Sequence, residues 1–532
     1  MTKQKGQSYM LGAVILVISN IIVKLIGALF RIPLTSIIGV ESIGYFSAAY
    51  NIYVMFYTVS TAGLPVAISR MIAAANSKGN NRKINKIFNI SLTLFFVIGA
   101  IGTSVMLLCS KQFAQYSEMT MSYLAIMAIA PTVFFICVSS AYRGYFQGLQ
   151  NMIPTAVSQV IESLGKLIIG LFAAWYFPRK VFVQMHVLAA YVISGVSIGV
   201  ALATLYIAIV KARHKLIVDS YVGVEDDEST SEILKCLLLT AIPITLSSSI
   251  MGLTSAADTF FITKRLVGAG LSETVATSYF GTYSGMVIPL LNLVPPFIYP
   301  FGISAIPAIS AAISKGDYKK AYSNIDSAFR NCSIIALPCA IGMAVLSKGI
   351  LSVVFKHETV GTTTTLDLAW PALSVVALSI LFLGVISITN AILQAWGKEK
   401  LTLYSTISGI IVKIIMTWSL SGIVKLGIIG SAIGTVLCYL TITVLNVIFV
   451  IKVTKYKPVI RNVFLKPVVS GILCGFTAFL SNMAITRLGI SIKLSTLVSI
   501  VFAAMVYFIS LLLLKGINRE DVLMMPKGQK IC

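Results

Sequence analysis

The chain has 532 residues, of which 57% are hydrophobic and only 11% are charged, and its formal net charge is +23. Its apolar residues recur in runs of about twenty, which is the length that a helix needs to cross a bilayer. This composition excludes a soluble globular domain and predicts an all-α polytopic membrane protein.

Fourteen transmembrane helices are predicted along the chain. They are expected at residues 11–32, 44–72, 87–109, 121–141, 154–177, 186–210, 233–262, 276–312, 330–355, 367–393, 402–421, 427–451, 463–485 and 493–514. Most Lys and Arg residues fall in the segments on the side of the N-terminus, and the positive-inside rule places that side in the cytoplasm. The chain is therefore expected in the cell membrane with both termini cytoplasmic, and its basic charge needs no nucleic-acid partner.

The first predicted helix carries Lys24 inside an apolar run and Arg31 seven residues later. Seven residues nearly complete two helical turns, so both side chains are expected on about the same face. Charged residues in the hydrocarbon region usually face a bundle interior or a water-filled cavity, which makes this face a candidate anion site. The alternative is that Lys24 meets a helix partner while Arg31 extends to the membrane interface.

Two further arginines lie near predicted cytoplasmic ends. Arg70, near the end of the second helix, is either a contact for an anionic ligand or an anchor of the kind that the positive-inside rule describes. Arg143 is expected in the cytoplasmic turn before the fifth helix, because polar residues cluster there and Pro154 suits the first turn of a new helix.

The predicted fifth helix carries Glu162 and Lys166, four residues apart and therefore on one face. Two interpretations stay open: an ion pair whose charges compensate each other inside the membrane, or side chains that line a cavity. In the sixth helix, Gly195 and Gly199 form a small-residue motif that favours close helix packing.

A weak internal repeat relates the two halves of the chain. The segment 70–83, RMIAAANSKGNNRK, aligns without gaps with the segment 307–320, PAISAAISKGDYKK. The segment 147–166 aligns likewise with the segment 394–413, so that Lys413 takes the place of Lys166.

This repeat predicts two pseudo-symmetric six-helix lobes, as in many transporters. The expected divisions are an N-terminal lobe at 1–215, a cytoplasmic linker at 216–232, a C-terminal lobe at 233–455, and two extra helices with a cytoplasmic tail at 456–532.

The second predicted lobe begins with two unusual helices. The seventh carries Asp258, followed by Lys264 and Arg265 at its outer end, and the acid either pairs with these bases or takes part in function. The eighth contains five of the sixteen prolines within nineteen residues. Because proline removes a helical hydrogen bond, a broken or bending helix is predicted there.

No metal or cofactor is expected. The eight Cys and three His residues are scattered, and no group of them has the spacing of metal ligands. No loop holds a set of acids and histidines that could build an active site, so the chain is not expected to be an enzyme. Coupling to an ion or to the membrane potential is left open.

Three stretches of the chain resemble one family. KLIGALFRIPLTSIIG at 24–39, STAGLPVAISR at 60–70 and especially YRGYFQGLQNMIPTAVSQVIE at 142–162 are similar to flippases of lipid-linked cell-wall precursors, of the MurJ and SpoVB type. That family belongs to a superfamily that also holds the MATE drug exporters. The resemblance covers essentially the whole chain.

The resemblance implies a flippase that carries lipid II, the lipid-linked peptidoglycan precursor, from the inner to the outer leaflet by alternating access. It also implies a role in cell-wall synthesis, cell shape or sporulation, with cell-wall synthesis proteins as partners and a groove for the lipid tail on the two extra helices. The alternatives are a flippase for another lipid-linked oligosaccharide or polysaccharide, and a MATE-type exporter of cations or drugs.

The resemblance further implies a central cavity whose basic residues meet the pyrophosphate of the substrate. This chain lacks a basic residue at mid-depth in the second helix and any in the eighth, and Lys166 and Lys413 are expected to supply that charge. The candidate substrate-binding residues are Lys24, Arg31, Arg70, Glu162, Lys166, Arg265 and Lys413.

Overall fold

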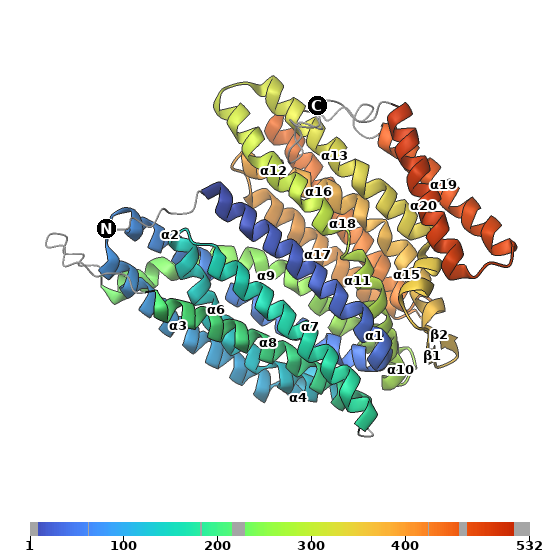
Figure 1. Ribbon diagram of the computed structural model, residues 1–532, viewed down its shortest axis with the longest axis horizontal. Coiled ribbons are helices and arrows are strands. Elements are labelled where there is room, and N and C mark those ends of the chain that lie inside the picture. Colours follow the sequence, from blue (N-terminus) through green and yellow to red (C-terminus); the bar gives the residue numbers. More distant parts are fainter. Residues whose placement is uncertain are drawn as a thin grey trace. The chain divides into compact units, whose positions relative to one another are not determined.

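The computed structural model describes residues 9–61, 63–180, 183–214, 229–423, 425–456 and 465–514, which are almost entirely helical (Figure 1). Contacts between the elements group the chain into two compact units. The first unit comprises Met1–Lys264 and Ser272–Gly281, and the second comprises Arg265–Leu271 and Thr282–Cys532. The predicted all-α class is confirmed, while the lobe boundaries drawn from the repeat stay a prediction.

The described elements of the first unit are all helices. They are α1 (Tyr9–Thr61), α2 (Gly63–Ser77), α3 (Asn81–Leu108), α4 (Ser110–Tyr116), the short 3₁₀ helix η1 (Thr120–Ser122), α5 (Tyr123–Ile129), α6 (Pro131–Gly148), α7 (Ile153–Lys180), α8 (Met185–Arg213), α9 (Thr230–Gly268) and α10 (Glu273–Thr282).

The second unit adds one small hairpin to its helices. Its elements are the π-helical segment η2 (Tyr283–Val287), α11 (Ile288–Leu291), α12 (Pro295–Ser314), α13 (Tyr318–Val345), α14 (Ser347–Val354), the antiparallel strands β1 (Thr359–Val360) and β2 (Thr363–Thr364), α15 (Thr365–Ala377), α16 (Ser379–Ala395), α17 (Lys400–Ser421), α18 (Ile428–Thr454), α19 (Lys466–Arg487) and α20 (Ile492–Leu513).

Within the described residues, twelve helical stretches are long and apolar enough to cross a membrane. One of them, Ile18–Ser77, covers two predicted spans, and α9, where the seventh span is predicted, is not among the twelve. The chain is therefore a multi-pass membrane protein, as predicted, and the number fourteen stays a prediction.

The structure corrects the prediction of a loop between the first and second spans. Residues 9–61 form the single helix α1, which is kinked at Gly39. Gly39 has φ 78° and ψ 163°, a conformation that is open to glycine because it has no Cβ. The chain therefore changes direction at one residue, and helix continues on both sides of it.

The first pair of repeated segments folds into the same turn in both units. Gly79 has φ 69° and Gly316 has φ 72°, so each segment passes through a left-handed glycine after a helix. The next residue in each, Asn80 or Asp317, caps the following helix, since its side chain accepts a hydrogen bond from the amide three residues later at 2.9 Å in both units. The sequence repeat is therefore a repeat of structure at this turn.

The second pair of repeated segments also folds alike. The turn between α6 and α7 passes through Gln150 with φ 58°, and the turn between α16 and α17 passes through Gly397 with φ 67°. In each turn the following amide donates to the carbonyl five residues before it, at 2.9 Å and 2.8 Å respectively. The helices that begin after these turns, α7 and α17, are therefore equivalent.

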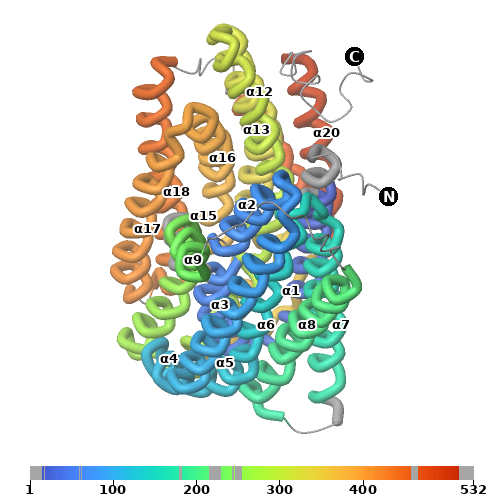
Figure 2. The backbone as a smooth tube through the Cα atoms, turned by 90° about the vertical axis from the view of Figure 1, so that its left-hand side faces the viewer, coloured from blue at the N-terminus to red at the C-terminus, as the bar shows by residue number. Residues whose placement is uncertain are grey.

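The glycines of α8 allow the close packing that the sequence predicts. A Cβ at Gly199 would lie 2.8 Å from the carbonyl oxygen of Glu162, and a Cβ at Gly195 would lie 2.6 Å from the amide nitrogen of Gly170. Helices α7 and α8 consequently run side by side, as α17 and α18 do in the second unit (Figures 1 and 2).

The predicted break in the eighth span is confirmed. Helix α10 passes into the π-helical segment η2 and then into α11, which ends at Leu291, and a new helix, α12, begins at Pro295. Pro295 and Pro296 occupy the first positions of α12, where the missing amide would have no helical partner anyway. The prolines therefore set the start of α12.

Replacing both Pro295 and Pro296 with alanine is expected to slow transport without preventing membrane insertion. The substitution restores two amide donors, which allows α11 to continue into α12 and removes the break. Transport by the double variant should be compared with wild type at equal amounts of membrane-inserted protein. An unchanged rate would assign the two prolines to packing alone.

Candidate anion-binding site

Lys166 of α7 lies against aromatic rings that α1 supplies. Its Nζ atom is 4.6 Å from the ring centroid of Tyr50 and 5.0 Å from that of Phe30. Phe30 precedes the kink at Gly39 and Tyr50 follows it, so the kink brings the two halves of α1 to one ammonium group. Such cation–π contacts stabilise a charge in an apolar environment by about 0.5–2 kcal/mol.

Arg31 approaches the same rings. Its Nη2 donates a hydrogen bond to the hydroxyl of Ser47, and its guanidinium carbon lies 5.1 Å from the ring centroid of Phe46. Phe46 is itself 6.0 Å from Tyr50, with the two rings nearly parallel at 11°.

We call Phe30, Phe46 and Tyr50 the aromatic cluster. The cluster is connected, because the centroids of Phe30 and Phe46 are also 6.0 Å apart. Two of the predicted site residues, Arg31 and Lys166, therefore meet at one aromatic cluster between α1 and α7. Two cations held in this way can offer charge-assisted hydrogen bonds to a phosphate group.

The structure corrects the predicted pairing of Glu162 with Lys166. The Oε2 atom of Glu162 lies 2.9 Å from Nη2 of Arg143, and Arg143 Nε also donates to the hydroxyl of Ser158 at 3.0 Å. The Arg143 side chain is only 6% exposed and that of Glu162 is 22% exposed. The acid is thus paired across helices with α6, and the second interpretation of Lys166, a side chain that lines a site, is the one compatible with this geometry.

The structure corrects the predicted position of Arg143, and the sequence did not reveal its ion pair. It lies inside α6, which continues to Gly148, and it does not lie in a turn. The available signal was its position in the conspicuous stretch 142–162, nineteen residues before the acid that it binds. The spacing of aromatic residues after the kink, Phe46 and Tyr50 among them, was likewise a signal for the ring cluster.

The other predicted residues of the first unit lie elsewhere. Lys24 is exposed on α1, seven residues before Arg31, and Arg70 is exposed on α2.

Arg265 and Lys413 belong to the second unit. Arg265 Nε donates to the backbone carbonyl of Trp418 at 2.9 Å, and its guanidinium carbon lies 4.8 Å from a ring centroid of the same residue. Arg265 is therefore bound to the end of α17. Lys413 is only 5% exposed within α17, at the position equivalent to Lys166.

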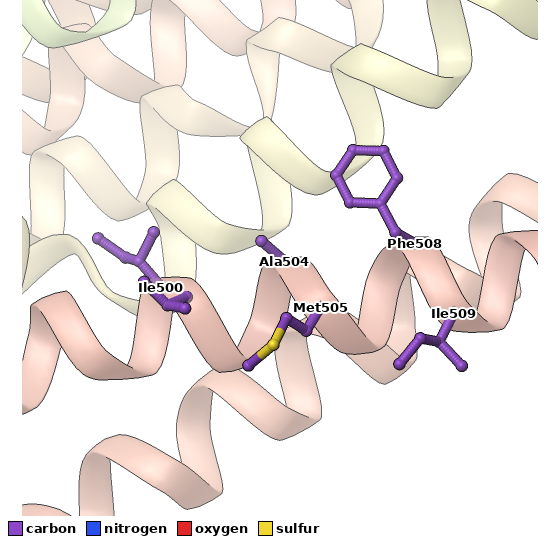
Figure 3. A pocket seen from close by; sticks show the side chains of 6 residues that line it. Ile500, Ala504, Met505, Phe508 and Ile509 are labelled. Carbon is purple, nitrogen blue, oxygen red and sulfur yellow. The ribbon is translucent and has the colours of Figure 1, made fainter.

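The two C-terminal helices carry a separate apolar feature. A shallow hollow of about 430 Å³ follows α20 and is lined only by apolar residues, Ile500, Val501, Ala504, Met505, Phe508 and Ile509 (Figure 3). Tyr507 fixes α20 to α13, since its hydroxyl donates to the carbonyl of Ile334 at 2.7 Å. The lining can accept a hydrocarbon chain and offers no polar contact.

Among the residues that the structure describes, no group of three His, Cys, Asp or Glu side chains could hold a metal ion.

Two family models match the sequence. The model described as polysaccharide biosynthesis protein matches residues 10–313, and the MatE model matches residues 243–419. Stage V sporulation protein B of Bacillus subtilis (strain 168) is 26% identical over 524 residues, which are 98% of each chain. Lipid II flippase MurJ of the same organism is 24% identical over 478 residues, covering 87% of this chain and 86% of that protein.

Solved structures show the same fold. Lipid II flippase MurJ in an inward closed conformation has a TM-score of 0.64 at 15% identity, covering 93% of this chain and 98% of that chain. A multidrug resistance MATE family transporter in its inward-facing conformation has a TM-score of 0.64 at 18% identity, covering 81% of this chain and 94% of that chain. These matches confirm the resemblance seen in the sequence, and the families concerned are transporters and flippases, not enzymes.

Proposed function

This chain belongs to the polysaccharide biosynthesis protein family, and we propose that it is a flippase that moves a lipid-linked pyrophosphate saccharide across the bilayer. The specific substrate that we propose is lipid II, carried from the inner to the outer leaflet of the cell membrane. Alternating access of two lobes, residues 1–215 and 233–455, is the proposed mechanism. The relatives named for sporulation and for lipid II support this choice.

The observation that carries the proposal is the meeting of Arg31 and Lys166 at the aromatic cluster. A pyrophosphate needs positive charge and several donors in a low-dielectric site, and a guanidinium together with an ammonium supplies both. Aromatic faces hold these cations in place without neutralising them. Lys24, Arg70, Arg265 and Lys413 are proposed to meet the substrate at other stages of transport.

The apolar hollow on α20 supports the lipid part of the proposal. A lipid-linked substrate carries a long hydrocarbon chain, which must stay in an apolar environment while the head group crosses. The hollow offers only apolar side chains along about two and a half turns of α20. We propose that the lipid tail lies along this helix.

A cation exporter of the MATE type is a weaker proposal for this chain. Such an exporter needs an acid that can bind a cation, and Glu162, an acid inside the predicted fifth span, is already paired with Arg143 at 2.9 Å. An anionic substrate matches the basic residues of the first unit better.

Complementation tests the proposed function. The chain should restore growth to a bacterial strain depleted of its lipid II flippase, and the purified protein in liposomes should carry fluorescent lipid II between leaflets. A flippase for another saccharide lipid serves as the matched comparison in the same strain. That flippase should not restore growth, and failure of this chain to restore growth, although it is inserted in the membrane, would assign it a different lipid-linked substrate.

The proposed orientation places the linker at 216–232 in the cytoplasm. A single cysteine introduced at Ser229, in a variant whose eight native cysteines are replaced by serine, should react with a membrane-impermeant maleimide only after the cells are opened. Labelling of intact cells would reverse the orientation of the whole chain.

A further inference from the structure

An acid lies one helical turn before the proposed anion-binding lysine. Glu162 and Lys166 are four residues apart on α7, a spacing at which opposite charges attract each other by about 0.2–0.5 kcal/mol even in water. The attraction is greater in the low-dielectric interior of a membrane protein. A lysine held in that pair would offer little net charge to an anionic ligand, so Glu162 competes with the ligand for Lys166.

Arg143 removes this competition in the structure. It binds the Glu162 carboxylate at 2.9 Å, and its Nε is fixed at the same time by Ser158 at 3.0 Å. The planar guanidinium loses less freedom in such a pair than a flexible ammonium does. Lys166 therefore lies over the rings of Tyr50 and Phe30, away from the carboxylate.

The internal repeat supplies a comparison within the same chain. Extending the second alignment toward the N-terminus places Asn390 at the position of Arg143, while Gly409 stands at the position of Glu162. In α17, Lys413 thus has a glycine one turn before it, where Lys166 has an acid. The half of the repeat that lacks the acid also lacks the arginine.

The contact between the two helices does not itself require a charged pair. In the second unit the fully buried Asn446 donates to Asn390 Oδ1 at 2.8 Å and accepts from the hydroxyl of Ser405 at 2.6 Å. Ser405 stands at the position of Ser158, and both hydroxyls donate to the carbonyl three residues before them. Neutral groups therefore tie the equivalent helices together, which argues against a merely structural reason for the ion pair.

We propose that Arg143 is a positioning residue that sequesters Glu162 and thereby keeps the charge of Lys166 available to the pyrophosphate of the substrate. This inference rests on the proposed function, in which Lys166 binds that group. When Arg143 is absent, Glu162 turns to Lys166 and neutralises the anion site. The arginine acts through these two residues and does not itself contact the ligand.

One test needs no ligand. The thermal unfolding of the full-length protein in lipid nanodiscs is measured for Lys166→Gln with Arg143 present and in the Arg143→Gln background. Lys166→Gln should lower the Tm by about 1–3 °C more in the Arg143→Gln background, because only there does Lys166 pair with Glu162. Adding Glu162→Gln should remove that extra loss, as a double-mutant cycle requires. Equal shifts in both backgrounds would overturn the inference.

A second test measures binding of farnesyl pyrophosphate to the same nanodiscs, with farnesol as the uncharged control. Arg143→Gln should weaken binding of the pyrophosphate by about tenfold or more, and Glu162→Gln should tighten it by about threefold. The double variant should recover most of the lost affinity, since no acid is left to capture Lys166. A double variant as weak as Arg143→Gln would show that the arginine acts in another way.

The two tests separate this inference from the proposed function. If the unfolding experiment shows the new pairing of Glu162 with Lys166, sequestration by Arg143 is supported whatever the ligand is. If wild type then binds farnesyl pyrophosphate no better than farnesol, the proposed pyrophosphate site fails while the positioning role of Arg143 stands.

Discussion

Lys166→Gln is expected to abolish complementation while the folded protein is still made at about the wild-type level. Glutamine keeps a donor group, one bond closer to the backbone, but cannot supply charge at the aromatic cluster. Hydrogen bonds to charged groups are worth about 1.5–3 kcal/mol, which corresponds to a loss of at least about tenfold in affinity for the pyrophosphate. The rate of lipid II translocation in liposomes, together with the amount of folded protein, measures this effect.

Two control variants make the Lys166 experiment decisive. Lys166→Arg should keep most of the activity, because it retains the charge. Lys211→Gln removes a lysine of the first unit that makes the same kind of contact, with its Nζ 4.4 Å from the ring centroid of Tyr145 and 5.1 Å from that of Phe88. Transport should be normal in this variant. Equal losses in Lys166→Gln and Lys211→Gln would mean that cation–π contacts support the fold only.

The sequence predicts the helices and the repeat because both depend on local signals. A run of about twenty apolar residues identifies a membrane helix without knowledge of its neighbours. The turns at Gly79 and Gly316 could likewise be aligned by sequence, since a left-handed glycine followed by a capping side chain is a local arrangement. The break before Pro295 follows from the chemistry of proline itself.

The candidate site could be predicted only in part because its contacts are not local. The spacing in the sequence favours a pair between Glu162 and Lys166 of the same helix. In the structure Glu162 instead binds Arg143 of the neighbouring helix α6. Likewise, nothing in the apolar run around Phe30 shows that the kink at Gly39 brings this ring to the same lysine as Tyr50. The intramembrane position of Lys166 could be read from the sequence, but the groups that compensate its charge could not.

The close approach of α1 and α10 leads to the prediction with the largest expected effect on folding. A Cβ at Gly281 would lie 1.8 Å from the carbonyl oxygen of Val40, next to the kink of α1. A Cβ at Gly44 would similarly lie 2.5 Å from the carbonyl oxygen of Thr277. The obstructing atoms belong to the backbone, so no side-chain rotation can relieve the clash.

Gly281→Ala is therefore expected to lower the stability of the folded protein by about 1–3 kcal/mol, the usual cost of overpacking, because α10 must move away from α1. Gly342→Ala is the matched control, since Gly342 lies inside α13 and a Cβ there meets no atom within 4 Å. Alanine at that position should leave the stability unchanged or raise it by about 0.5–1 kcal/mol, because glycine is the weaker helix former. Thermal unfolding of the two purified variants in detergent gives the comparison. The same Tm for Gly281→Ala and wild type would show that α1 and α10 do not need this close backbone contact.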